Sequence, residues 1–143
     1  MLKTLLSPHS DRVYAAIRIA SGLMFSFHGM QKTFGLLWNP SWPRPTLSSQ
    51  AGIGGIIELV TGLLIAAGLF TRCAAFLASG TMAVAYWQFH VFGNHELQGI
   101  PRYIPAMNNG TPAVLYCFWF LYMACKGAGP WSVDARREQA PKS

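Results

Sequence analysis

Six side chains that can donate, accept or carry a proton stand inside or at the ends of long apolar stretches of this sequence. They are His28, Gln31, Lys32, Glu58, Tyr86 and His90. Glu58 is the most isolated of them, because it is the only charged residue in GGIIELVTGLLIAAGLF, which covers residues 54–70. A basic donor beside a carboxylate and a tyrosine can bind a carbonyl group and supply a proton to it. Ionisable groups in apolar segments usually face a partner or a cavity, so these residues form the candidate site.

Four apolar segments must position these side chains, and they cover residues 13–34, 51–70, 73–92 and 111–128. A helix needs about 20 residues to cross the hydrocarbon layer of a membrane. The apolar runs are continuous rather than alternating, which favours helices over barrel strands. We therefore expect an all-α fold, an integral membrane antiparallel four-helix bundle that forms a single domain over residues 1–143. A soluble helical bundle is the alternative, but the two middle segments lack the polar faces it would need.

The charges agree with a membrane protein and indicate its orientation. Charged residues make up 11% of the chain, against roughly 25% in soluble proteins. With four spans, the side that holds both termini collects Lys3, Arg12, Arg72, Lys126, Arg136, Arg137 and Lys142, and the other side has Lys32, Arg44 and Arg102. The positive-inside rule then predicts a multi-pass membrane protein with both termini in the cytoplasm. The net charge of +6 comes mostly from these residues, so nucleic-acid binding is not expected.

Counting depth along the expected helices brings candidates from three segments to one level. At about 1.5 Å per residue, His28 and Glu58 both lie about 10 Å below the outer boundary, Tyr86 about 9 Å, Lys32 about 5 Å and His90 about 3 Å. The simplest arrangement is a buried pair of Glu58 with Lys32 or with His28. Such a pair either only fixes the packing of the helices or belongs to a proton-accessible pocket at the level of a quinone or lipid headgroup. Both interpretations remain open at this point, as does the charge of Glu58.

Two further features concern packing. Gly55, Glu58, Gly62 and Ala66 share one helix face, and small residues around a carboxylate favour a close approach of another helix. Arg18 lies at the opposite, cytoplasmic end of the first segment, where we expect it to form a structural clasp with Asp134. These two residues are therefore assigned to the framework and not to the site.

Cofactor motifs are not recognisable in the sequence. The three cysteines, Cys73, Cys117 and Cys125, form no CxxC pair, and with the four histidines they show no zinc-ligand spacing. We see no haem, flavin or iron–sulfur motif either. The expectation is no metal site and no cofactor held by the chain itself, with a quinone as the candidate ligand.

Three stretches, taken in order, resemble the DoxX family of small membrane proteins. They are RIASGLMFSFHGMQKTFG at 18–35, IIELVTGLLIAAGLFTRCAAF at 56–76 and GAGPWSVD at 127–134. The segment before the last helix is similar to one bacterial branch in which N-G-G precedes that helix, with Asn109 here at the first glycine. The motif positions that the resemblance carries over are Arg18, His28, Gly29, Lys32, Glu58, Arg72 and Asp134.

The resemblance implies a bacterial inner-membrane four-helix bundle whose namesakes are similar to the small subunit of a thiosulfate:quinone oxidoreductase. We therefore expect a membrane subunit of a quinone-linked redox system. Its expected partners are membrane lipid, an oxidoreductase subunit and further copies of the chain. The alternative is a non-enzymatic scaffold that anchors or assembles a partner protein. The sequence leaves open whether the chain is itself an enzyme.

Overall fold

The computed structural model describes residues 2–36 and 43–140, and within these ranges the fold is all-α, with no strand. The helices are α1 (Leu2–Leu6), α2 (Ser10–Phe34), α3 (Gln50–Ala67), α4 (Thr71–Ala85), α5 (Thr111–Lys126) and α6 (Val133–Gln139). Three short elements complete the described ranges: η1 (Ser7–His9), η2 (Tyr86–Phe92), which is a π-helix, and η3 (Ile100–Tyr103). The four predicted segments are thus helical, and the all-α prediction is confirmed.

The ends of these helices differ from the predicted ones for local reasons. Helix α3 stops before the predicted residue 70 because Gly68 adopts a left-handed conformation with φ of 69°, which glycine adopts without strain. Gly127, with φ of 93°, ends α5 in a similar way. The third segment reaches its predicted end only because α4 continues into the π-helix η2. Helix α6 was not predicted, since its sequence, VDARREQ, has no apolar run.

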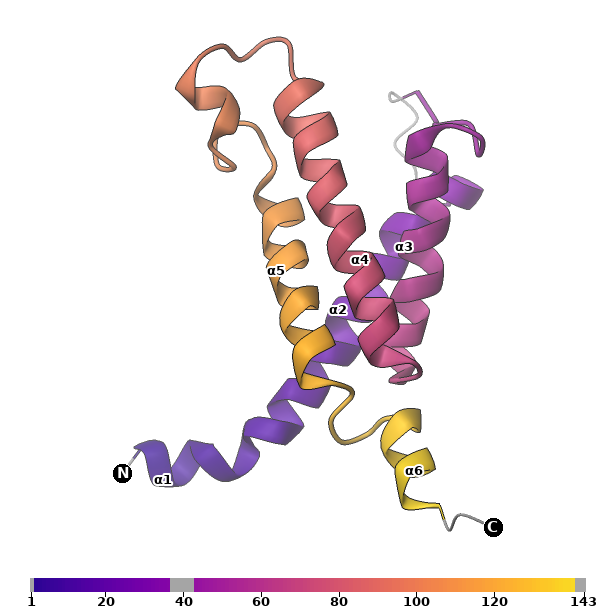
Figure 1. Cartoon of the computed structure of the whole chain (residues 1–143), viewed down its shortest axis with the longest axis vertical. Helices are drawn as coiled ribbons and strands as arrows, with labels where there is room; N and C mark the ends of the chain where they lie inside the picture. The colour runs from indigo at the N-terminus through magenta and orange to yellow at the C-terminus, as the bar shows by residue number, and fades with distance from the viewer. Residues whose placement is uncertain (1, 37–42, 141–143) are drawn as a thin grey trace.

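The helices form two antiparallel pairs, α2 with α3 and α4 with α5, which a tight turn between α3 and α4 connects (Figure 1). Both termini lie at the end of the molecule where this turn is found, and the segments that join α2 to α3 and η2 to α5 lie at the other end. The two pairs lean apart toward that second end, so the molecule has the outline of a V. The site described below lies between the two pairs.

Glycines allow α2 and α3 to pack backbone against backbone. A Cβ atom added to Gly62 would lie 2.6 Å from the amide nitrogen of Ser26 and 2.7 Å from the carbonyl oxygen of Gly22. Two turns further along, Gly29 faces Gly55 and Leu59 in the same manner. The predicted face of small residues on α3 is therefore a helix–helix contact, as close packing between membrane helices requires.

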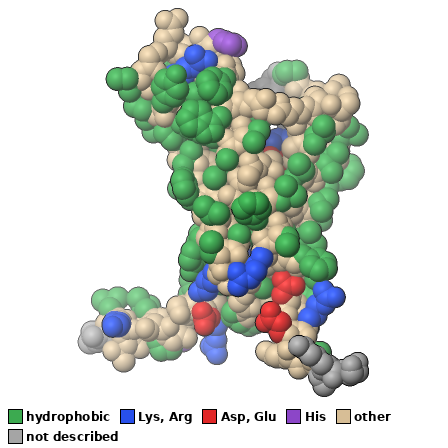
Figure 2. Space-filling view, viewed as in Figure 1, with side chains coloured by type: hydrophobic (Ala, Val, Ile, Leu, Met, Phe, Trp, Pro, Cys, Tyr) green, Lys and Arg blue, Asp and Glu red, His purple; other side chains and the backbone are tan. Residues whose placement is uncertain are grey.

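The distribution of side chains on α3 is the inverse of that in a water-soluble protein. Its buried face carries Glu58 and Thr61, whereas Ile53, Val60 and Leu63 are about half exposed at 50%, 49% and 52%. Figure 2 shows hydrophobic side chains over both helix pairs and charged side chains gathered at the end with the termini. Among the described helices, α3 is the one that is long and apolar enough by itself to cross a membrane.

Candidate functional site

Lys32 and Glu58 form an ion pair between α2 and α3, which is one of the two pairings of Glu58, with Lys32 or with His28, left open above. The Nζ atom of Lys32 donates to Oε1 of Glu58 at 2.6 Å. The side chain of Glu58 is 3% exposed and that of Lys32 is 31% exposed. The pair forms where it does because Gly55 contacts the Lys32 side chain and leaves room for its aliphatic stem against α3. The lysine thus reaches Glu58 from the open end of the V.

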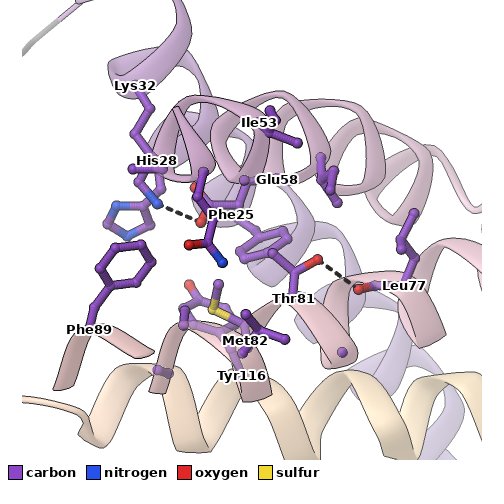
Figure 3. A pocket seen from close by; sticks show the side chains of 18 of the residues that line it. Phe25, His28, Lys32, Ile53, Glu58, Leu77, Thr81, Met82, Phe89 and Tyr116 are labelled. Atoms are coloured by element: carbon purple, nitrogen blue, oxygen red, sulfur yellow. Dashed lines mark hydrogen bonds and ion pairs between the residues drawn. The ribbon is translucent and has the colours of Figure 1, made fainter. Parts of the chain in front are cut away.

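A cavity of about 670 Å³ opens from this pair into the space between the two halves of the V. Its polar end contains His28, Lys32, Gln50, Glu58 and His90. The rest of its wall is almost entirely apolar and comes from α2, α3, α4, η2 and α5: it includes Phe25, Ile53, Ile57, Phe76, Leu77, Met82, Val84, Phe89 and Tyr116. Figure 3 shows Lys32 and Glu58 at one end of the pocket, with His28 and Phe89 beside them. We call this cavity the groove.

Glu58 is not fully satisfied by its lysine partner. Its second carboxylate oxygen, Oε2, is buried and has no hydrogen-bond partner among the described residues. A buried acceptor that lacks a partner typically costs about 1–3 kcal/mol, and more when the group is charged. The folded chain therefore carries an unfilled hydrogen-bonding position at the polar end of the groove.

The other predicted site residues are only partly brought together. His90 lines the groove, and its Nδ1 donates to the carbonyl oxygen of Asn108 at 3.1 Å. Tyr86 does not join Glu58, because its hydroxyl donates instead to the carbonyl oxygen of Tyr103 at 2.8 Å. Gln31 lies on α2 beside Lys32 but is not part of the groove lining. Of the two predicted residues that follow α4, His90 therefore lines the groove and Tyr86 does not.

The structure adds residues that sequence reasoning missed. Asn108 is 1% exposed and donates to the carbonyl oxygen of Arg102, while its own side-chain oxygen accepts the amide of Gly110. It thereby organises the loop that holds Tyr86 and His90. The N-G-G resemblance was a signal for this position. Gln50 and Gln88 hydrogen-bond to each other between α3 and η2, and no pattern in the sequence indicates that pair.

The predicted direct contact between Arg18 and Asp134 is wrong. Arg18 is fully buried, and its guanidinium donates to the carbonyl oxygens of Ile65 at 2.6 Å, Ala66 at 2.8 Å and Trp131 at 2.8 Å. The first two of these carbonyls belong to the last turn of α3, and that of Ile65 also accepts the amide of Gly68 at 3.1 Å. Backbone carbonyls thus take the place of a carboxylate partner at the terminal nitrogens of Arg18, whereas its buried Nε has no hydrogen-bond partner among the described residues. A cation at a helix C-terminus is favourable.

Asp134 instead binds the start of α4. Its carboxylate accepts from the amides of Phe70 at 3.0 Å and Thr71 at 2.9 Å, and from the Thr71 hydroxyl at 3.0 Å. Burial by itself would raise the pKa of Asp134, but these hydrogen bonds and the charge of Arg137 together hold it below its ordinary value. Arg18 and Asp134 therefore stabilise opposite sides of one turn: Arg18 the end of α3, Asp134 the start of α4. They belong to the framework, as predicted, but act through the backbone.

Comparison with known proteins places the chain in a family. The sequence matches DoxX over residues 13–91, and the chain belongs to this family of membrane-associated helical proteins. It is also similar to an uncharacterised protein of Haemophilus influenzae, with 35% identity over 127 residues that cover 84% of this chain and 87% of that protein. No solved structure matches the chain significantly. The matched range contains His28, Lys32 and Glu58, and so the polar pair of the groove.

Proposed function

We propose that this chain is a multi-pass protein of the bacterial inner membrane and the membrane subunit of a quinone-linked redox system, with the quinone headgroup bound at Lys32 and Glu58. The single observation that carries the proposal is the groove itself. A buried ion pair with an unfilled acceptor stands at one end, and an apolar channel leads away from it. A quinone has the same two parts, a polar ring and an apolar tail.

The surface supports a position inside the membrane. Large apolar side chains are exposed on α2, α3, α4 and α5 alike, for example Phe27 at 51%, Leu63 at 52%, Phe76 at 68% and Phe118 at 66%. Monomeric soluble proteins rarely expose apolar surface so widely. Charges cluster at the end with both termini (Figure 2), which supports cytoplasmic termini by the positive-inside rule. Reporter fusions test this topology: green fluorescent protein at the C-terminus should fluoresce, and alkaline phosphatase inserted in the 93–110 loop should be active.

The size and wall of the groove support a small amphipathic ligand. About 670 Å³ lies within the roughly 300–1,000 Å³ usual for small-molecule sites. Lys32 and His28 can donate to a quinone carbonyl, and Glu58 can accept a proton or a hydrogen bond. Phe89 and Phe25 offer aromatic faces close to that polar end (Figure 3). Electrons for the ring would come from a partner protein, which is the reason for proposing a subunit.

Two glycines in the wall allow a direct test by filling the groove. Gly54 and Gly80 line it, and a Cβ atom added to either would meet nothing within 4 Å. Gly54→Leu and Gly80→Leu should therefore fill the groove without a clash, and they should not lower helix stability, since leucine is the better helix former by about 0.8 kcal/mol or more. We expect each to weaken the binding of decylubiquinone to purified protein in nanodiscs by at least about tenfold, because the site is occupied.

Val60→Leu is the matched control, since Val60 is on α3 and exposed but does not line the groove. It should bind decylubiquinone as the unmodified chain does, and all three variants should keep their thermal stability. Saturable binding that Gly54→Leu and Gly80→Leu leave unchanged would contradict the assigned site. Absence of saturable binding to the unmodified chain would refute the quinone proposal and favour a scaffold role.

A further inference from the structure

The Oε2 atom of Glu58, which has no hydrogen-bond donor among the described residues, affects which form of a ligand binds in the groove. Glu58 is held by the ammonium group of Lys32 at 2.6 Å, and a carboxylate so paired has oxygens that only accept hydrogen bonds. Oε1 receives the lysine, and Oε2 has no donor among the described residues. The side chain of Glu58 is only 3% exposed. Oε2 can therefore be paired only by a ligand group that donates a hydrogen bond.

We infer that the groove selects a headgroup that donates a hydrogen bond, and therefore prefers the reduced quinol over the oxidised quinone. The inference rests on the proposed function and names the form of its ligand. A quinol ring carries two hydroxyl groups, one of which can donate to Oε2 of Glu58. A quinone ring has only carbonyl oxygens at these places, and a carbonyl oxygen against a carboxylate oxygen is repulsive.

Access to the oxygen requires little movement. Glu58 lines the groove, and the terminal torsion of a glutamate side chain is broad, so its carboxylate can turn toward the groove. The aromatic wall near the polar end, Phe25 and Phe89, accommodates either form of the ring, because the two forms differ little in shape. His28 and Lys32 can still donate to the oxygen of a hydroxyl group. The hydroxyl hydrogen atom of the quinol is therefore the main difference between the two forms that affects binding at this site.

The other polar groups at this end of the groove do not remove the preference. His90 is turned to the carbonyl oxygen of Asn108 through Nδ1, and Gln50 is bonded to Gln88. The ammonium group of Lys32 has hydrogen atoms beyond the one given to Glu58, so Lys32 and His28 can donate to a ring oxygen of either form. A hydrogen bond to a charged group is among the stronger ones in proteins, and its loss corresponds to at least about tenfold in affinity.

The test compares three ligands with one tail: decylubiquinol, decylubiquinone and the dimethyl ether of decylubiquinol, which has no donor and is not oxidised. Binding is measured by isothermal titration calorimetry to the full chain in nanodiscs under nitrogen. We expect the quinol to bind at least about tenfold more tightly than the quinone or the ether. In Glu58→Gln, whose amide group can both donate and accept, the difference should fall to about threefold or less.

The results separate this inference from the proposed function. If the quinone or the ether binds as tightly as the quinol to the unmodified chain, the donor preference is refuted and the quinone site stands. If no ligand of the three binds, the proposed function fails and the inference fails with it. Binding to Glu58→Gln is interpreted only if this variant shows a cooperative thermal unfolding transition. The comparison of the three ligands on the unmodified chain tests the donor preference without it.

Discussion

Arg18→Met is expected to lower the free energy of unfolding by at least about 3 kcal/mol, the largest effect of any substitution considered. Arg18 is fully buried, and its guanidinium donates to backbone carbonyls of α3 and of the segment after α5. Methionine fills a similar volume but leaves the carbonyls of Ala66 and Trp131 without the guanidinium donor, while that of Ile65 keeps only the amide of Gly68. In a chain of this size the loss corresponds to a decrease of at least about 6 °C in Tm, measured by thermal unfolding in detergent micelles.

Arg12→Met is the matched control, because Arg12 is on the same helix and exposed. It should change the free energy of unfolding by no more than about 0.5 kcal/mol. Arg18→Lys should be intermediate, since lysine keeps the charge but not the planar fork that reaches several carbonyls at once. A Tm for Arg18→Met within about 2 °C of the unmodified chain would show that the junction does not depend on this guanidinium.

Lys32→Met is expected to destabilise the protein by about 3 kcal/mol, because it leaves the buried carboxylate of Glu58 without its partner. The value is at the lower end of the range for broken buried pairs, since Lys32 itself is 31% exposed. The double substitution Lys32→Met with Glu58→Leu should recover most of this loss, because apolar residues often replace a buried pair at little cost. A double-mutant cycle on thermal unfolding measures both effects.

Lys126→Met is the control for this pair. Lys126 lies 3.6 Å from Asp11, whose side chain is 72% exposed, and over the ring of Tyr14. Exposed contacts of this kind contribute about 1 kcal/mol or less, so the control should be mild. If the double variant at Lys32 and Glu58 is as unstable as Lys32→Met alone, the loss does not come from an unpaired Glu58, and the electrostatic account of the pair is wrong.

Depth counting brought Glu58 close to the levels of His28 and Lys32 because the three residues lie on a pair of regular helices that pack through glycines, but it left open which of the two is its partner. In such a pair, the number of residues from the helix end fixes the level, and Gly22, Gly29, Gly55 and Gly62 fix the face. The same count does not give the contact of Tyr86, whose hydroxyl donates to the carbonyl oxygen of Tyr103. Tyr103 follows an irregular loop, and the position of such a residue cannot be counted from a helix end.

The contacts of Arg18 and Asp134 could not be read from the sequence for a different reason. Their partners are backbone groups, the carbonyls at the end of α3 and the amides at the start of α4. Every residue carries such groups, so residue types give no sign of them. From residue types alone, the expected partner of Arg18 is the opposite charge of Asp134. In the fold, both side chains hydrogen-bond to backbone groups at two helix ends instead. A polar pocket beside Glu58 was one of the two interpretations of the sequence, but the size and the wall of the groove could not be predicted, since they depend on how far the helix pairs lean apart.

The most direct test of the central claim is an experimental structure of the chain in nanodiscs with decylubiquinol. We expect density for the ring at the polar end of the groove, with a ring oxygen about 2.5–2.7 Å from the carboxylate of Glu58, and the tail between α3 and α4. A groove that holds only lipid tails in the presence of saturating ligand, or a ring bound elsewhere on the protein, would contradict the assignment of this site.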